Sequence, residues 1–493
     1  MAPKNLDQGQ PNATDLAQRS VYGSFDARVH SEPTIEPDMT VMILLRRLDG
    51  QFIRAFLKPS STDAVSYRSA QHLTTESLVF VSGSTVATHD HHHQLDNGDT
   101  AAPEVASFRV AKLTVRSRAR AVLPEHPRLH GAPGEVLPPA GAAGGELLRE
   151  RLDNRLLDAR VAATAAIFKL SSGVHELAVE HLAARGFFHV PTPALVAYEF
   201  PGEEDDLFSV PYFGRTARLA PTGEVHLGMA LSADLERVYD FHSVFRREPG
   251  SDGRHLTEFT MLELVFSLQR DWTEILDTAS DLIVSLVQSL QKRDKYLELT
   301  RTAQRLYPSA GKFKLGLDQH GKLIRLTFKE AKEILRASLG QQSNDDDDED
   351  FTREEEAALG RFLASDESHI GHPTDVFVVT HFPRHLRPCN IYPSEDGDNT
   401  SQSFDVILRG QEIITGCRLL HSHEELRSAF TTRVPPIDPD SAEWRPYVLA
   451  HEIGMPPWGG FGMGINRLVQ GFWGLDDIRE TVLFPRDATR LTP

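Results

Sequence analysis

FHSVFRREPGSDGRHLTEFTMLELVFSL, residues Phe241–Leu268, combines two strand-like halves with a polar turn. The first half ends in the charged residues RRE at 246–248. The turn at 249–253 consists of residue types that tolerate turn dihedrals. The second half, 256–268, carries β-branched and aromatic residues between polar ones, as strands do. An arginine at a strand end offers a planar fork that matches a phosphate. The stretch therefore fits either a triphosphate clamp on a rigid sheet or an ordinary surface hairpin.

Length, charge and cysteine content limit the classes of protein. A chain of 493 residues is too long for one hydrophobic core and predicts two or three domains. Its formal charge of −18 argues against affinity through a broad phosphate-binding surface. The absence of an apolar run of about eighteen residues, and of an apolar segment near the N-terminus, predicts neither membrane insertion nor secretion. Two cysteines, Cys389 and Cys417, are too few for a disulfide framework and favour a reducing, cytoplasmic compartment.

The N-terminal third predicts a small barrel between two irregular segments. Residues 1–20 are polar and predict a disordered tail. Residues 120–150 are rich in Pro, Gly and Ala and predict a linker. Between them, turn residues separate alternating segments, which predict an antiparallel β-barrel over 21–119. These segments are Val21–Val29, Met39–Arg47, Gln51–Leu57, Glu76–Val86 and Phe108–Val115.

The run His89–His93 lies inside this barrel segment and admits two interpretations. Histidine-rich tracts bind metals in some proteins. Adjacent histidines on a loop, however, fix no coordination geometry. We therefore favour a solvated loop over a metal site.

Residues 151–493 predict a second, larger domain that mixes helices and strands. Helical periodicity indicates helices at Asp158–Arg185 and Asp271–Arg293, and Gly186 is suited to end the first. The acidic run Gln341–Ala358 is interpreted as a solvated, poorly ordered loop. Strand candidates follow at Thr374–Thr380, Phe404–Arg409 and Glu412–Leu420, and Gly459–Leu468 predicts a glycine-rich turn from a strand into a helix.

Taken in order, these segments resemble class II aminoacyl-tRNA synthetases, and most closely the archaeal and eukaryotic type of aspartyl-tRNA synthetase. Gly186–Leu195 (GFFHVPTPAL) resembles motif 1, with Pro193 as its proline. The strings FRRE and RHLTEF within 245–259 resemble motif 2, and Gly459–Leu468 resembles motif 3. RGQEIITG at Arg409–Gly416 lies between motifs 2 and 3, as in that family. The resemblance implies an α/β (α+β) chain: an N-terminal OB-fold barrel, then a catalytic domain whose antiparallel sheet is flanked by helices. It also implies a homodimer, because motif 1 forms the subunit interface in the family.

The resemblance further implies that the chain binds ATP. Arg246 would hold the α-phosphate and the substrate carboxylate during adenylation. Phe259 and Arg467 would stack on opposite faces of adenine, and Glu248 would position it. The implied ATP-binding set is Arg246, Arg247, Glu248, Arg254, His255, Leu256, Phe259, Glu412, Gly464, Ile465, Asn466 and Arg467, of which Arg246, Glu412 and Arg467 would be catalytic.

The triphosphate end of the implied site includes a metal. Arg254 and His255 lie in the turn that would reach the γ-phosphate. Glu412 and Thr415 would hold Mg²⁺ between phosphates, because magnesium takes hard oxygen ligands and shares them with phosphate. The family has serine where Thr415 stands, so the hydroxyl ligand is kept.

The implied amino-acid pocket departs from the family. Two positions where aspartyl-tRNA synthetases read the substrate side chain with lysine and arginine hold Leu227 and Leu419, and the histidine before motif 3 becomes Trp458. A carboxylate buried there without a cation would cost several kcal/mol. Glu224 and Glu263 occupy positions near the α-amino group and still favour a cation. We therefore expect an amine-bearing acid with a neutral or apolar side chain. The pocket comprises Glu224, Leu227, Glu263, Thr415, Leu419 and Trp458.

The barrel also departs, and three functions stay open. Met42 stands where the family stacks an anticodon base on phenylalanine, which weakens the expectation of aspartate tRNA as a partner. The preferred hypothesis is a paralogue that adenylates an amino acid and passes the acyl group to another acceptor. The second is a genuine aspartate or asparagine tRNA ligase. The third is a non-catalytic regulatory homologue.

Overall fold

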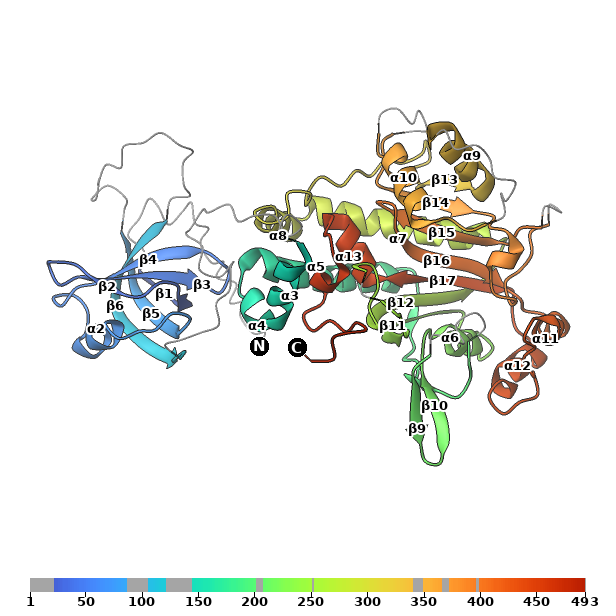
Figure 1. Ribbon diagram of the computed structural model, residues 1–493, viewed down its shortest axis with the longest axis horizontal. Coiled ribbons are helices and arrows are strands. Elements are labelled where there is room, and N and C mark those ends of the chain that lie inside the picture. Colours follow the sequence, from blue (N-terminus) through green and yellow to red (C-terminus); the bar gives the residue numbers. More distant parts are fainter. Residues whose placement is uncertain are drawn as a thin grey trace, which may run out of the picture. The chain divides into compact units, whose positions relative to one another are not determined.

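The computed structural model describes residues 22–86, 105–120, 144–200, 207–250, 252–339, 349–365, 372–395 and 399–492 (Figure 1). The predicted tail at 1–20, the run His89–His93 and residues 121–143 of the predicted linker fall outside this part. Contacts divide the chain into two compact units, residues 1–138 with 145–162, and residues 139–144 with 163–493. Among the described residues, no helix is both long and apolar enough to cross a bilayer.

The first unit contains the predicted barrel. Its strands run in the order β1-β5-β6-β4-β3-β2, and a further pairing of β1 with β3 closes the sheet. All pairings are antiparallel except that of β4 with β6. Alternate residues Val41, Ile43 and Leu45 are buried, as the period of two in a strand requires. The elements are β1 (Tyr22–Val29), β2 (Thr34–Ile35), β3 (Val41–Arg47), β4 (Phe52–Leu57), α2 (Ala64–Ala70), β5 (Leu78–Val86), β6 (Ala106–Ser117), α3 (Gly144–Asp153) and α4 (Arg155–Asp158).

The second unit contains an eight-stranded sheet in the order β13-β14-β15-β16-β17-β12-β11-β7 (Figure 1). Only the outermost pairings, β13 with β14 and β11 with β7, are parallel. A small sheet β8-β10-β9 accompanies it. The strands are β7 (Phe188–His189), β8 (Leu195–Val196), β9 (Ser209–Tyr212), β10 (Arg215–Leu219), β11 (Arg237–Phe245), β12 (Glu258–Ser267), β13 (Ile324–Thr327), β14 (Val376–Thr380), β15 (Ser403–Leu408), β16 (Glu412–Leu419) and β17 (Trp458–Gly464).

Helices pack on this sheet through apolar faces. Helices α7 and α13 both contact the central strands β16 and β17, and α6 contacts β11 and β12. The antiparallel sheet flanked by helices is therefore as predicted. The helices are α5 (Ala162–Ala183), α6 (Glu224–Leu231), α7 (Thr273–Lys292), α8 (Asp294–Ala303), α9 (Phe328–Leu339), α10 (Arg353–Leu363), α11 (His423–Thr432), α12 (Arg445–Glu452) and α13 (Ile465–Trp473), with short 3-10 turns η3 (Arg384–Leu386) and η4 (Ile478–Thr481).

The loop prediction for Gln341–Ala358 is wrong at 353–358, and residues 341–348 of that run lie outside the described part. Residues 353–363 form α10, whose N-terminus is closed by a capping box between Thr352 and Glu355. Carboxylates in a first helical turn are favoured by the helix dipole. Leu359 and Leu363 are buried in one cluster with residues of β14 and β15. Glu354, Glu355 and Glu356 of the acidic run thus belong to a capped helix start.

Candidate active site

One cavity of about 340 Å³ brings most of the predicted site together. The predicted residues that line it are Arg246, Glu248, Arg254, His255, Leu256, Phe259, Glu412, Thr415, Gly464, Asn466, Arg467, Glu224, Glu263 and Leu419. The predicted residues that do not line it are Arg247, Ile465, Leu227 and Trp458. Residues from motif 2, the 409–416 segment and motif 3 therefore meet at one place, although they lie far apart in sequence.

The pairing of β11 with β12 positions the motif 2 side chains. Val244 lies opposite Phe259 in the ladder. The guanidinium carbon of Arg246 lies 5.8 Å from the centroid of the Phe259 ring, a cation–π geometry. Arg467, near the start of α13, donates through Nη1 to the Glu412 backbone carbonyl at 3.1 Å. Arg467 on α13 and Phe259 on β12 thus bring a cation and an aromatic ring to the cavity wall from separate elements.

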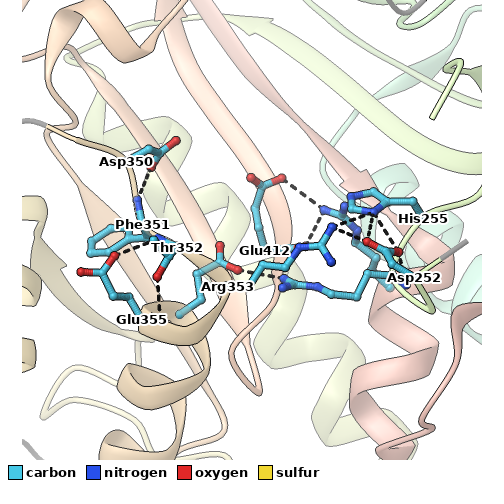
Figure 2. A network of polar contacts seen from close by, with 11 residues as sticks. Asp252, His255, Asp350, Phe351, Thr352, Arg353, Glu355 and Glu412 are labelled. Carbon is cyan, nitrogen blue, oxygen red and sulfur yellow. Dashed lines mark hydrogen bonds and ion pairs between the residues drawn. The ribbon is translucent and has the colours of Figure 1, made fainter. Parts of the chain in front are cut away.

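The turn between β11 and β12 is held by its own acidic residue. Asp252 accepts hydrogen bonds from the Arg254 backbone at 2.9 Å and pairs with His255 Nδ1 at 2.9 Å (Figure 2). Burial alone would raise the pKa of Asp252. The hydrogen bonds from Arg254 and His255 outweigh it and hold that pKa well below its usual range. Asp252 therefore ties together residues 252–255, which carry the arginine and the histidine.

The residues at the predicted magnesium position supply hard oxygen ligands. Glu412 and Thr415 both line the cavity. Asp405 lies opposite Thr415 in the pairing of β15 with β16. Within the described ranges, no group of three or more His, Cys, Asp or Glu side chains forms a ready metal site. This donor set fits an ion that completes its shell with phosphate, as magnesium does.

Asp405 was not predicted, nor was its partner Arg387. Arg387 donates through Nη2 to Asp405 Oδ2 at 2.6 Å and stacks over the Phe382 ring at 3.8 Å. Burial raises the pKa of Asp405, Arg387 opposes that shift, and the charge of Glu412 adds to it. The pair lies beside the predicted metal position, since Asp405 is opposite Thr415 and Arg387 lines the cavity.

The amino-group end carries the two predicted glutamates. Glu263 accepts from Thr222 Oγ1 at 2.6 Å and from the Gly223 backbone at 2.5 Å, and it pairs with His242 Nε2 at 2.9 Å. Burial and then the charge of Glu263 raise the pKa of Glu224 to about 8, against the opposing effect of a hydrogen bond with Asn390. At neutral pH Glu224 therefore holds its proton.

The side-chain end is apolar, but only part of the predicted set lines it. Leu419 and Cys417 reach the cavity. Leu227 and Trp458 are wholly buried in the hydrophobic cluster that also contains Leu419. A methyl group on Gly228 would lie 2.6 Å from the Trp458 ring, so the indole fills the space under α6. Leu227 and Trp458 therefore belong to the packing behind the cavity wall.

The glycines of motif 3 have a packing reason as well as the implied nucleotide one. A methyl group on Gly460 would lie 2.0 Å from the Leu264 carbonyl oxygen, and one on Gly459 would lie 2.3 Å from Ile275 of α7. No side chain fits at either position. Gly464, by contrast, is close only to the Arg467 side chain. Only Gly464 is therefore free of these packing constraints.

We expect Glu224→Gln to raise the melting temperature at pH 8 by a few degrees and to leave it nearly unchanged at pH 5. The folded pKa of about 8 lies above the ordinary value of 4.5. Between these values the unfolded chain releases a proton that the folded chain keeps, so the free energy of unfolding falls as pH rises. Glutamine carries no such proton. Thermal unfolding at both pH values measures the difference, and an equal shift at both would contradict the assignment.

A family model described as tRNA synthetases class II (D, K and N) matches residues 148–488. "Aspartate--tRNA ligase 1, cytoplasmic" of Arabidopsis thaliana is 33% identical over 344 residues, which are 70% of this chain and 61% of that protein. The match thus spans 61% of the plant relative's length. "Aspartate--tRNA(Asp) ligase" of Pyrococcus horikoshii is 31% identical over 387 residues, which are 78% of this chain and 79% of that protein.

Solved structures agree on the fold. An aspartyl tRNA synthetase from Entamoeba histolytica aligns with a TM-score of 0.78 at 26% identity, over 100% of this chain and 96% of that one. Asparaginyl-tRNA synthetase from Pyrococcus horikoshii, complexed with asparaginyl-adenylate, gives 0.77 at 24% identity, over 99% and 100%, and shows the fold alone. The predicted fold and resemblance are confirmed. This chain belongs to the family of class II tRNA synthetases (D, K and N).

Proposed function

We propose that this chain is an ATP-dependent ligase that activates an amino acid as its adenylate, with a side-chain preference other than aspartate. The observation that carries the proposal is that the two ends of one cavity differ in chemical character. Its nucleotide end keeps Arg246, Glu412 and Arg467, whereas its side-chain end presents Leu419 and Cys417. Of the arginines among the described lining residues, Arg387 alone lies outside the motifs, and Asp405 neutralises it.

The adenylation step uses these groups as follows. A carboxylate oxygen of the amino acid attacks the α-phosphorus of ATP, the bond from that phosphorus to the bridging oxygen breaks, and pyrophosphate leaves. Arg246 stabilises the negative charge that grows on the α-phosphate. Glu412 and Thr415 would hold Mg²⁺, which when bound neutralises charge on the phosphates. Glu263 lies where it attracts the α-ammonium group, with the protonated Glu224 beside it.

The proposal also covers the acyl acceptor and the oligomeric state. We favour an acceptor other than aspartate tRNA, because Met42 replaces the stacking aromatic in the barrel. A genuine aspartate or asparagine tRNA ligase is the second candidate, supported by the names of the relatives. A cytoplasmic homodimer is proposed by analogy with the family and with the plant relative named as cytoplasmic.

Amino-acid-dependent exchange of pyrophosphate into ATP tests the proposal, with each of the common amino acids supplied separately. We expect exchange with amino acids that carry small neutral or apolar side chains, and an aspartate rate lower by about two orders of magnitude, because a buried unpaired carboxylate costs several kcal/mol. Robust exchange with aspartate alone would contradict the altered preference. Charging of total tRNA with the activated amino acid then separates the tRNA ligase from the paralogue.

A further inference from the structure

Helix α10 meets the turn between β11 and β12 through two pairs of opposite charge. Glu356 Oε2 lies 2.8 Å from Arg254 Nη2, with side chains 17% and 22% exposed. Arg353 pairs with Asp252, and its Nη2 lies 3.5 Å from His255 Nδ1. Arg353 and Glu356 are three residues apart and share one helix face. Figure 2 shows Arg353 on α10 directed toward Asp252 and His255, with Glu412 beside them.

The start of α10 is firmly anchored. Thr352 donates its backbone N–H to Glu355 Oε2 at 2.8 Å, and its hydroxyl accepts from the Glu355 backbone at 3.2 Å. The preceding Phe351 packs on Phe328, with ring centroids 4.7 Å apart, and Lys332 Nζ lies 4.7 Å from the Phe351 ring centroid. The first turn of α10 is therefore held in place by interactions that do not involve the cavity.

The same helix also contacts the turn that leads into Glu412. A methyl group on Gly360 would lie 2.6 Å from the Gly410 backbone nitrogen, and one on Gly410 would lie 2.6 Å from the Ala357 Cα. Gly410 has a φ of +74°, which a residue with a side chain rarely adopts. One helix therefore touches both turns that carry the groups for the triphosphate, Arg254 on one and Glu412 on the other.

The carboxyl group of Glu356 is placed to support Arg254. Its pKa is raised overall, because burial and the charge of Glu412 outweigh the hydrogen bond and charge of Arg254. A guanidinium has five N–H donors, so Arg254 can bind Glu356 along one edge and a phosphate along another. If Glu356 only competed with phosphate for Arg254, it would not have to be held in place by an anchored helix such as α10.

We propose that Glu356 is a positioning residue of the triphosphate subsite, which holds the Arg254 guanidinium toward the cavity through α10. The proposal rests on the nucleotide part of the proposed function. Arg254 would contact the γ-phosphate, which AMP lacks. A change at Glu356 should therefore alter the binding of ATP and not that of AMP. Arg353, through Asp252, supports the same turn from the more exposed side.

Calorimetric binding of a magnesium-loaded, non-hydrolysable ATP analogue and of AMP to the full chain tests this. Glu356→Gln keeps the shape and removes the charge. We expect it to weaken the ATP analogue about tenfold, since charge-assisted hydrogen bonds fix the guanidinium, and to change AMP binding less than about twofold. Glu354→Gln, at an exposed position of the same helix turn, is the matched control and should match the parent chain for both ligands.

Three outcomes would overturn the proposal. The first is unchanged binding of the ATP analogue. The second is tighter binding, which would make Glu356 a competitor. The third is an equal loss for AMP. If Glu356→Gln melts well below the parent chain, Glu356→Asp, which keeps the charge on a shorter arm, carries the same comparison with a several-fold loss expected for ATP only. The binding measurement needs no amino acid. Absence of pyrophosphate exchange would therefore contradict the proposed ligase activity, whereas the comparison of ATP with AMP binding would still decide the role of Glu356.

Discussion

Arg246→Ala is expected to lower amino-acid-dependent pyrophosphate exchange by about 10²- to 10³-fold, the size of effect found when one stabilising donor is removed from a developing anion. Arg246 lines the cavity and faces Phe259, so alanine removes both the phosphate donor and the cation over the ring. The loss should appear mainly in kcat, because the charge on the α-phosphate grows toward the transition state.

The matched control is Arg301→Ala, which removes a guanidinium at an exposed position of α8. It should change the exchange rate less than about twofold, as surface substitutions generally do. Thermal unfolding of both variants checks that the chain remains folded. Retention of more than about a tenth of the exchange rate in folded Arg246→Ala would show that this arginine does not carry the chemistry.

Trp458→Ala is expected to destabilise the unit of residues 163–493 by about 3–5 kcal/mol, as large-to-small substitutions of buried aromatic residues do. The Trp458 side chain is 0% exposed, packs under Gly228 and donates its indole N–H to the Leu420 carbonyl at 3.2 Å. That carbonyl also faces His451 Nε2 at 3.2 Å, so the cost comes chiefly from lost packing.

Urea unfolding followed by tryptophan fluorescence measures this effect. All four tryptophans lie between residues 272 and 473, so the signal reports on that unit alone. Phe213→Ala, at a 92% exposed position, is the control and should shift the free energy of unfolding by less than about 0.5 kcal/mol. A loss below about 1 kcal/mol for Trp458→Ala would mean that the ring does not fill the core as described.

Local patterns were sufficient for the strands and the motifs. The main barrel strands begin and end within two residues of their predicted bounds, because alternation and turn residues are properties of the strand itself. Most residues predicted to bind nucleotide line one cavity, since each sits at a fixed offset within a motif that folds as one hairpin or one strand-to-helix turn. Arg247 and Ile465, the two that do not line the cavity, are neighbours of residues that do.

What could not be predicted depends on contacts between distant segments. Alignment gave Leu227 and Trp458 as pocket residues, but whether a side chain faces a cavity or the core behind it depends on how α6 packs on the sheet. Asp405 was missed because Thr415, the residue opposite it, lies on another strand. Only the alignment of β15 with β16 in the sheet would have suggested that Asp405 belongs to the site. The spacing Thr352-x-x-Glu355 was a readable helix signal inside the acidic run, and net charge hid it.

The backbone contact between Gly360 and Gly410 has a consequence for movement. Side chains between two elements can change rotamer and so absorb a small displacement. Two glycines in contact have no such slack, so a shift of α10 passes directly to the loop before Glu412. Because Glu356 of the same helix contacts Arg254, the parts of the cavity wall that carry Arg254 and Glu412 are coupled through α10. A ligand that displaces one of them is therefore expected to displace the other.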